Sequence, residues 1–347
     1  MASNYNITMK QYNGTDYDVL YPKTVIEQVD GIEQIIDSVG AKVLAKVLGA
    51  SAGATVTATQ GATVKTAQTD SSGVATLILG YGDWVLSDGV GSKTVTVNTY
   101  QIYNVVVNVD TVLNNNSWAK IQQTSNLNLG ESLWAVGDTK NITFSGTVVG
   151  TTFNLDTWVY IIGFNHNSDI EGNGIAFQCF KTAQTGGVDI CLTSFYMNSS
   201  NTNSGGWNGC YAYKTICPAI KACFPSDLQA VIKSTTLYTD NTGGGSNIAS
   251  YVTANSNDVY YLAEFEVQGT RTHANSAEQN YQKQYKYYAD GNSTIKYGYS
   301  STTSAQNWWN RSPDASNSSD FCNVNTSGSA YTINAGGTRG AAPAFKI

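Results

Sequence analysis

The chain has 347 residues, of which 41% are hydrophobic and 13% charged, and its formal net charge is −6. This apolar and aromatic content excludes general disorder, and the length predicts about two or three domains. The absence of a basic stripe argues against a nucleic-acid-binding protein, and no apolar run reaches the roughly 20 residues that a membrane helix needs.

The first 48 residues contain two segments of different character. Residues 1–24 are polar and rich in tyrosine, and we interpret them as an extended arm for attachment to a larger structure. In residues 25–48, apolar residues recur at alternating spacings of four and three, which predicts a helix with a coiled-coil seam. Gly31 and Gly40 each weaken such a helix by about 1 kcal/mol relative to alanine. The helix could join copies of the chain or pack on its own chain.

Residues 49–110 alternate Val, Leu or Ile with Thr or Ser, which is typical of β-strands. The turn signals TDSSG and LSDGVG divide the segment into several strands. The order of these strands and turns resembles the small transthyretin-like or carboxypeptidase-regulatory-like β-sandwich. That resemblance implies a spacer domain.

After a predicted linker at residues 111–116, the pattern becomes mixed and predicts an α+β domain with long loops. KACFPSDLQAVI predicts a helix with its N-terminal boundary at residues 225–227. VYYLAEFEV, residues 259–267, predicts a strand. NSAEQNYQKQYKYYADG, residues 275–291, predicts a second helix that ends near Gly291.

Residues that carry chemistry are scarce. The only histidines are His166 and His273, which excludes a histidine-rich metal site and leaves few candidates for a Ser-His-Asp triad. GASAG, residues 49–53, matches G-x-S-x-G but lacks the strand-to-helix context of a nucleophile elbow. Asp240 in YTDNTGGGSN could help to hold a cation, although a solvated loop is the alternative.

The six cysteines form no C-x-x-C pair, so we expect buried free thiols. The carboxylates, among them Glu264 and Glu266, form no evident pair of acid and nucleophile, and we expect surface or hydrogen-bonded structural roles for them. The N-terminus lacks the features of a signal peptide, so we expect synthesis in a reducing cytoplasm. We therefore predict a protein without enzymatic activity, cofactor or metal site, although the sequence leaves calcium binding open.

Several segments of residues 114–347 together resemble a domain family of phage and prophage tail proteins from gut bacteria. They include WAVGDTKNITFSGTV, IIGFNHNS, NWWNRSP, FCNVNTSGSA and GAAPAFKI. The resemblance implies a C-type-lectin-like α+β domain, a fold shared with formylglycine-generating enzymes. The predicted fold class is thus a multidomain β-rich and α+β protein with an arm, a helix, a sandwich and a lectin-like domain. NYNITMKQYNGTDYDVLYPKT separately resembles the start of phage tail and fibre proteins.

This chain departs from the lectin-like family at two points, and these limit which properties of the family we expect it to share. The family's ending is typically G-V-x-P-x-F, whereas this chain ends with GAAPAF. Ala341 there removes a β-branched contact, which costs about 1 to 2 kcal/mol if the site is fully packed. Cys322 stands alone, so the catalytic cysteines of formylglycine-generating enzymes cannot be placed.

By this resemblance, the chain is a virion component, made in the cytoplasm of the bacterial host, that binds a protein or glycan receptor on the host surface. Other phage tail proteins would be its partners, and a homotrimer is usual for tail fibres. Neither nucleic acid nor membrane insertion is implied. The alternatives are a structural tail protein without receptor contact, a glycan-binding adhesin and, less favoured, a glycan-processing enzyme.

Many lectin-like proteins of this kind are variable proteins of diversity-generating retroelements, in which template adenines near the 3′ end of the gene are randomised. Randomised AAC or AAT codons cannot encode Lys, Glu, Gln, Met or Trp, and none of these occurs in residues 314–340. An ordinary polar loop remains the alternative to such diversification.

The prediction separates a fixed frame from replaceable contact residues. The predicted buried frame comprises Trp308, Trp309, Arg311, Pro313, Phe321, Val324, Pro343 and Phe345, with Arg311 held to a carboxylate or carbonyl. The predicted receptor-binding residues are Asn310, Asp314, Ala315, Ser316, Asn317, Ser319, Asp320, Asn323, Tyr331, Thr332, Ile333, Asn334, Gly336, Gly337 and Arg339.

Overall fold

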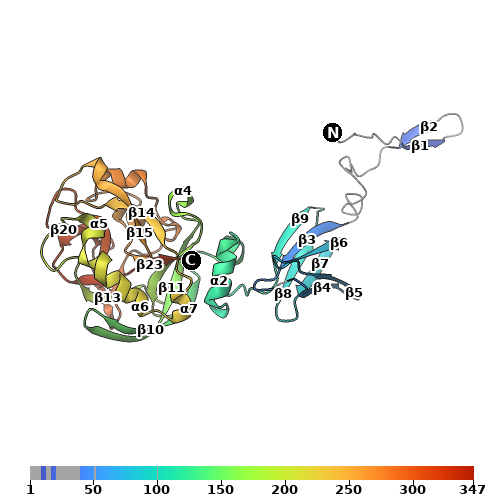
Figure 1. Ribbon diagram of the computed structural model, residues 1–347, viewed down its shortest axis with the longest axis horizontal. Coiled ribbons are helices and arrows are strands. Elements are labelled where there is room, and N and C mark those ends of the chain that lie inside the picture. Colours follow the sequence, from blue (N-terminus) through green and yellow to red (C-terminus); the bar gives the residue numbers. More distant parts are fainter. Residues whose placement is uncertain (1–8, 13–16, 21–39, 51, 100) are drawn as a thin grey trace. The chain divides into compact units, whose positions relative to one another are not determined.

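A computed structural model describes residues 9–12, 17–20, 40–50, 52–99 and 101–347. The chain divides into two compact units, Met1–Val109 and Asp110–Ile347. Both contain several β-strands (Figure 1), which confirms the coarse prediction of a multidomain β-rich protein. Within the predicted arm, β1 (Met9–Tyr12) and β2 (Tyr17–Leu20) form an antiparallel pair.

Seven strands of the N-terminal unit form two sheets that share one hydrophobic core. One sheet has the order β6-β3-β9 and the other the order β5-β4-β7-β8. Alternate residues of four of these strands point into the core, where Val43, Val56, Leu77 and Trp84 pack together. The strands are β3 (Ala41–Lys46), β4 (Thr55–Gln60), β5 (Thr63–Gln68), β6 (Val74–Leu79), β7 (Gly82–Ser87), β8 (Ser92–Val97) and β9 (Ile102–Val106).

The predicted helix at residues 25–48 is wrong in its last part, because Ala41–Lys46 forms strand β3. This strand is central in its sheet and pairs with β6 and β9, and every second side chain is buried. The two-residue alternation therefore overrides the helical spacing. The rest of that helix, residues 25–39, lies outside the described residues, as does Ser51 of the GASAG segment.

The C-terminal unit contains a five-stranded and a seven-stranded sheet and one separate hairpin. The five-stranded sheet has the order β10 (Thr139–Val148), β11 (Thr151–Phe164), β12 (Ile175–Lys181), β23 (Ala344–Lys346), β16 (Val259–Tyr260). The seven-stranded sheet has the order β18 (Ser301–Gln306), β17 (Lys296–Gly298), β13 (Ile190–Phe195), β22 (Arg339–Ala341), β19 (Trp308–Pro313), β20 (Asp320–Val324), β21 (Ala330–Asn334). The hairpin pairs β14 (Thr235–Asp240) with β15 (Val252–Asn257).

Short helices and turns connect these strands (Figure 1). The longest of them is α2 (Trp118–Asn126), which Ser117 caps by accepting a hydrogen bond from the N–H of Lys120. The others are η1 (Leu113–Asn115), α3 (Gly130–Leu133), α4 (Ser168–Glu171), α5 (Gly206–Gly209), η2 (Ala212–Ile216), α6 (Cys217–Ala222), α7 (Ser226–Gln229), η3 (Ala249–Tyr251), α8 (Glu264–Gln268), η4 (Ser276–Asn280) and α9 (Lys286–Ala289). None of the helices in the described residues is long and apolar enough to span a bilayer.

Two element predictions in this unit need correction. The strand predicted for residues 259–267 ends at Tyr260, and Glu264–Gln268 is the helix α8. The helix predicted for residues 275–291 is broken into η4 and α9. In both segments buried carboxylates accept hydrogen bonds from backbone N–H groups: Glu264 from Ala274, Glu266 from Ala263 and Glu278 from Asp240.

The C-terminal strand holds the five-stranded sheet together. β23 lies between β12 and β16, and the Phe345 ring stacks on Phe177 at 5.4 Å between ring centroids. The carbonyl of Ile347 accepts hydrogen bonds from the N–H of Ile175 and the hydroxyl of Ser125. Ala341 is fully buried in the seven-stranded sheet.

Candidate functional site

The two adjacent tryptophans of β19 anchor the centre of the seven-stranded sheet. Both are fully buried, and neighbouring side chains of a strand point to opposite faces of a sheet. The ring N–H of Trp308 donates to the carbonyl of Thr294 at 2.9 Å, and that of Trp309 donates to the carbonyl of Phe195 at 2.7 Å. All eight residues of the predicted frame are buried.

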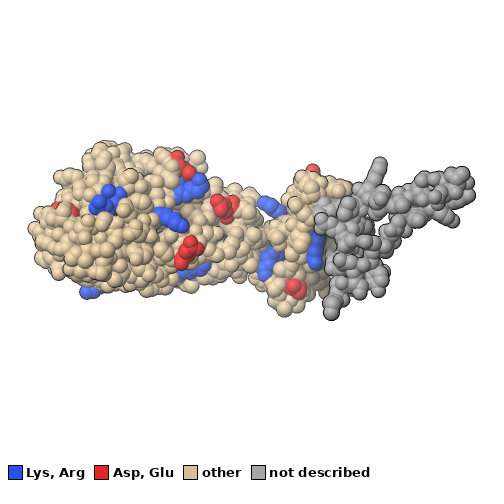
Figure 2. Space-filling view, turned by 90° about the horizontal axis from the view of Figure 1, so that it is seen from above, with Lys and Arg blue, Asp and Glu red and all other residues tan. Residues whose placement is uncertain are grey.

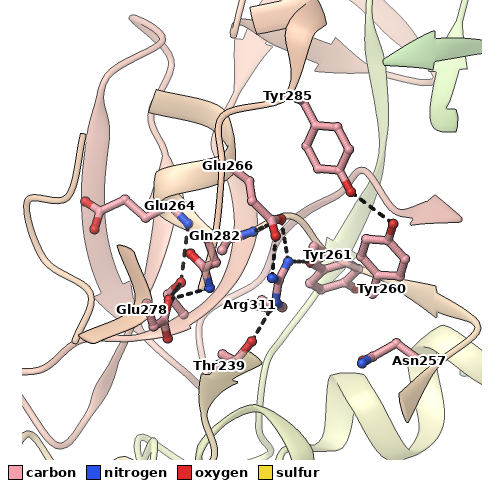
Figure 3. Close-up of polar contacts among 12 residues, drawn as sticks. Thr239, Asn257, Tyr260, Tyr261, Glu264, Glu266, Glu278, Gln282, Tyr285 and Arg311 are labelled. Atoms are coloured by element: carbon pink, nitrogen blue, oxygen red, sulfur yellow. Dashed lines mark hydrogen bonds and ion pairs between the residues drawn. The ribbon is translucent and has the colours of Figure 1, made fainter. Parts of the chain in front are cut away.

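Arg311 is the polar tie of this frame, as the sequence predicted. Its guanidinium forms a bidentate pair with Glu266, with both N–O distances 2.5 Å (Figure 3). It also donates to the hydroxyl of Thr239 and the carbonyl of Tyr261. Burial lowers the pKa of Arg311, but the facing Glu266 carboxylate outweighs this effect and raises the pKa above its ordinary value.

A second buried carboxylate lies beside this pair. Glu278 accepts hydrogen bonds from the N–H of Asp240 at 2.9 Å, the hydroxyl of Ser312 at 2.6 Å and the amide of Gln282 at 3.1 Å. Burial raises the pKa of Glu278 to about 7, against the opposing effect of these donors. A carboxyl group whose pKa lies near neutral therefore packs beside the Arg311–Glu266 pair.

Four of the predicted receptor-binding residues are buried, so the prediction that they face a receptor is wrong. Asn310 and Asn323 are fully buried because β19 and β20 lie inside the sheet. Asp314 is 3% exposed, and its carboxylate accepts hydrogen bonds from the N–H and hydroxyl of Ser316. Asp320 is 9% exposed, and its carbonyl accepts a hydrogen bond from the N–H of Asp314. These four residues belong with the frame.

The other eleven predicted residues, together with Ser318 and Thr338 that lie between them, form what we call the contact surface, defined as residues 315–319, 331–334 and 336–339. Ser316, Asn317 and Asn334 are exposed, and Tyr331 is 51% exposed. The remaining members are half-buried or exposed. The N–H of Ala335 donates to the carbonyl of Ser319 at 2.9 Å, which joins the segments side by side.

The contact surface carries little charge. Its sequences are ASNSS, YTIN and GGTR, so Arg339 is its single charged residue. On the face shown in Figure 2, charged side chains of the C-terminal unit are scattered and form no continuous patch of one sign. Hydroxyl, amide and glycine groups with one exposed tyrosine make a surface suited to hydrogen bonding and packing, which is also the composition of antibody contact loops.

The residues considered for metal or acid–base chemistry have structural roles. His166 is buried and stacks on Tyr285 at 3.7 Å between ring centroids, and burial lowers its pKa to about 4. The carbonyl of His273 accepts a hydrogen bond from the N–H of Ala315. No group of three or more His, Cys, Asp or Glu side chains in the described ranges could hold a metal ion.

Asp240 does not lie in a solvated loop, and its carboxylate is already occupied by protein donors. It is 1% exposed, and one oxygen accepts hydrogen bonds from the N–H groups of Thr242 and Gly243. The other oxygen accepts a hydrogen bond from the Asn275 amide. The structure therefore fits neither the cation-binding role nor the solvated loop that the sequence suggested for Asp240. The residue instead organises the turn that follows β14.

The six cysteines are buried free thiols, as predicted. Burial raises the pKa of Cys191 and of Cys210 to about 12, which keeps both thiols protonated and unreactive at neutral pH. Glu264 and Glu266 are fully buried and hydrogen-bonded, which confirms the expected structural role and excludes the surface alternative.

Sequence reasoning missed Asn203, which is fully buried beside residues 314–320 and donates hydrogen bonds to that segment. It also missed the buried cluster of Asp189, Lys181 and Lys296. No local signal identifies Asn203, because it lies in an asparagine- and serine-rich stretch whose other members are mostly exposed.

The C-terminal part of the chain matches one known protein family. The model of a family described as a domain of unknown function (DUF6273) matches residues 189–347. This part contains all seven strands of the sheet that carries the contact surface. A search of curated proteins found no match.

Among solved structures, a DUF3823 family protein from Bacteroides ovatus ATCC 8483 matches with 10% sequence identity and a TM-score of 0.17. The match covers 46% of this chain and 66% of that chain.

Proposed function

We propose that this chain is a tail-tip or tail-fibre protein of a phage or prophage, and that it binds a receptor on the bacterial surface through the contact surface. The observation that carries the proposal is a fully buried aromatic frame followed directly by exposed, small and almost uncharged residues. An adhesive loop needs this combination, since the frame fixes its position and the exposed residues make the contacts.

The domain identities belong to the same proposal. We assign a C-type-lectin-like fold to the C-terminal unit on the resemblance of residues 114–347, which nearly coincide with Asp110–Ile347. The two-sheet N-terminal unit would be the transthyretin-like or carboxypeptidase-regulatory-like spacer, and residues 1–24 would attach the chain to the tail. A trimer would multiply weak single contacts, and avidity gains are often on the order of 10² to 10⁴.

The backbone contacts of residues 314–320 support targeted diversification of the contact surface. The N–H of Asp314 donates to the carbonyl of Asp320, and the N–H of Ala315 donates to that of His273. Such bonds do not depend on the exposed side chains of Ser316 or Ser318, so these positions can change while the backbone bonds remain. Asn310, Asp314, Asp320 and Asn323 are not part of this proposed variable set.

Antibodies raised against residues 314–320 provide a test on intact virions. Receptor binding through this surface predicts that the antibodies bind the virion and block its adsorption to host cells. A structural tail protein predicts that the segment is inaccessible in the assembled tail and that adsorption is unchanged. Antibodies against residues 301–304, on the strand at the opposite edge of the sheet, serve as the control.

A further inference from the structure

Asn203 holds the backbone of residues 314–320 from outside that segment. The residue lies between β13 and α5 and is fully buried. Its side-chain amide donates to the carbonyl oxygens of Asp314, Asn317 and Asp320 at 3.0, 2.9 and 2.8 Å. Its main-chain N–H donates to the carbonyl of Ser318 at 2.7 Å. One asparagine therefore contacts four carbonyl groups of a seven-residue segment.

A run of three glycines holds Asn203 and the same segment from the other side. The N–H of Gly244 donates to the side-chain oxygen of Asn203 at 2.8 Å. A Cβ atom at Gly243 would lie 1.9 Å from the carbonyl oxygen of Asn203, and one at Gly245 would lie 2.6 Å from the nitrogen of Ser318. Only glycine permits this approach of backbone to backbone.

The segment's own side chains contribute little to its conformation. Asp314 and Asn317 each cap a local turn, by accepting hydrogen bonds from the N–H groups of Ser316 and Ser319 respectively. Ser316 and Ser318 are exposed. The contacts that determine the conformation of residues 314–320 are therefore made mostly by residues outside this segment.

We infer that Asn203, supported by Gly245, is the positioning residue of the contact surface, and that it sets the backbone of residues 314–320 independently of the side chains displayed there. The positioning role of Asn203 follows from these contacts and does not depend on which ligand the surface binds. Its consequence for binding rests on the proposed function: a loop whose backbone is fixed by other residues can change its specificity and keep its conformation.

Hydrogen exchange of the full-length protein, measured by mass spectrometry, tests this inference. Asn203→Asp keeps the side-chain volume but places a carboxylate oxygen against three carbonyl oxygens. We expect the amides of Asp314, Ala315, Asp320 and Ala335 to exchange at least about tenfold faster, since each loses a hydrogen bond of ordinary strength when the loop opens. Exchange in β12 and β23 should stay unchanged.

Two glycine variants form a matched pair that does not depend on Asn203→Asp folding well. Gly244 and Gly245 both have positive φ, +83° and +67°, so alanine strains the backbone at either site. A Cβ at Gly244 meets nothing within 4 Å, whereas one at Gly245 meets the loop. Gly245→Ala should accelerate loop exchange about tenfold, whereas Gly244→Ala should not. Equal loop exchange in these two variants would overturn the inference, even if Asn203→Asp destabilises the whole unit.

Binding of the same variants to host cells separates the two proposals. Both hold if Asn203→Asp accelerates loop exchange and weakens cell binding. If loop exchange accelerates but cell binding is unchanged, the positioning role stands and the receptor-binding role of this loop fails. If loop exchange is unchanged in Asn203→Asp, the positioning role is contradicted, whether or not the variant still binds host cells.

Discussion

The buried Arg311–Glu266 pair is the residue-level feature on which the frame depends most. Both side chains are almost inaccessible to solvent, and the pair is bidentate. Removing one partner from such a pair leaves the other charged group buried and uncompensated.

Replacing Arg311 with methionine should therefore lower the free energy of unfolding of the C-terminal unit by about 3 to 5 kcal/mol. Urea denaturation followed by tryptophan fluorescence measures the change. Arg339→Met is the control, because Arg339 is half-buried and forms no ion pair with the described residues. A loss below about 1 kcal/mol for Arg311→Met would contradict the role given to the pair.

Glu278 should make stability depend on pH. Its pKa rises from 4.5 to about 7 in the folded state, so folding favours the protonated form. The resulting stabilisation, about 3 kcal/mol for this shift, is fully present below pH 4.5 and is lost as pH rises through 7.

The difference in stability between the wild type and Glu278→Gln isolates this effect from other titrating groups. The wild type should lose stability relative to the variant between pH 4.5 and 7, because glutamine does not titrate. Urea denaturation at several pH values measures both proteins. A difference that stays constant across this range would show that Glu278 does not titrate there.

At the level of elements, the loop of residues 314–320 should tolerate large side chains at its exposed positions. We predict that Ser316→Tyr and Ser318→Tyr each change the free energy of unfolding by less than about 0.5 kcal/mol, as is usual for surface positions. Asn203→Ala, which removes the side-chain amide contacts to three carbonyl oxygens, should cost several times more. Thermal unfolding compares the three variants, and a comparable loss in all three would contradict the external control of the loop.

Comparison of predicted and observed elements shows where sequence patterns predict secondary structure correctly and where they do not. Alternation of apolar and polar residues predicted strands in residues 49–110 because β4, β6 and β7 each have one face toward a single core. The same rule failed for residues 41–46, where the spacing fitted a helix as well as a strand. It failed again at residues 261–267, where Glu264 and Glu266 accept backbone hydrogen bonds from distant or preceding residues.

The site was predictable only in part for a similar reason. The tryptophans could be assigned to the frame from residue type, because large aromatic side chains are highly buried on average, whereas proline and arginine are mostly exposed and an arginine is buried only when it is paired. Exposure of small polar residues could not be assigned, as the burial of Asn310 and Asn323 demonstrates. The role of Asn203 depends on contacts with residues more than 100 positions away.

At the scale of the whole molecule, the proposed function assigns spacing to Met1–Val109 and receptor contact to Asp110–Ile347. Each has its own buried core, and the contact surface lies entirely within Asp110–Ile347. Its low charge suits contact with a receptor that needs no electrostatic steering, so we predict that cell binding changes less than about threefold between 0.05 and 0.5 M salt. Fluorescently labelled protein on host cells measures this dependence, and a tenfold loss would indicate a charged interface instead.

The most direct test of the central claim is the binding of two matched variants to host cells. Ser316→Tyr changes the contact surface, whereas Ser304→Tyr makes the same substitution at an exposed position on β18, at the opposite edge of the sheet. The account predicts that Ser316→Tyr weakens binding at least about tenfold while Ser304→Tyr leaves it unchanged, with both proteins folded. Equal binding by the two variants would contradict it.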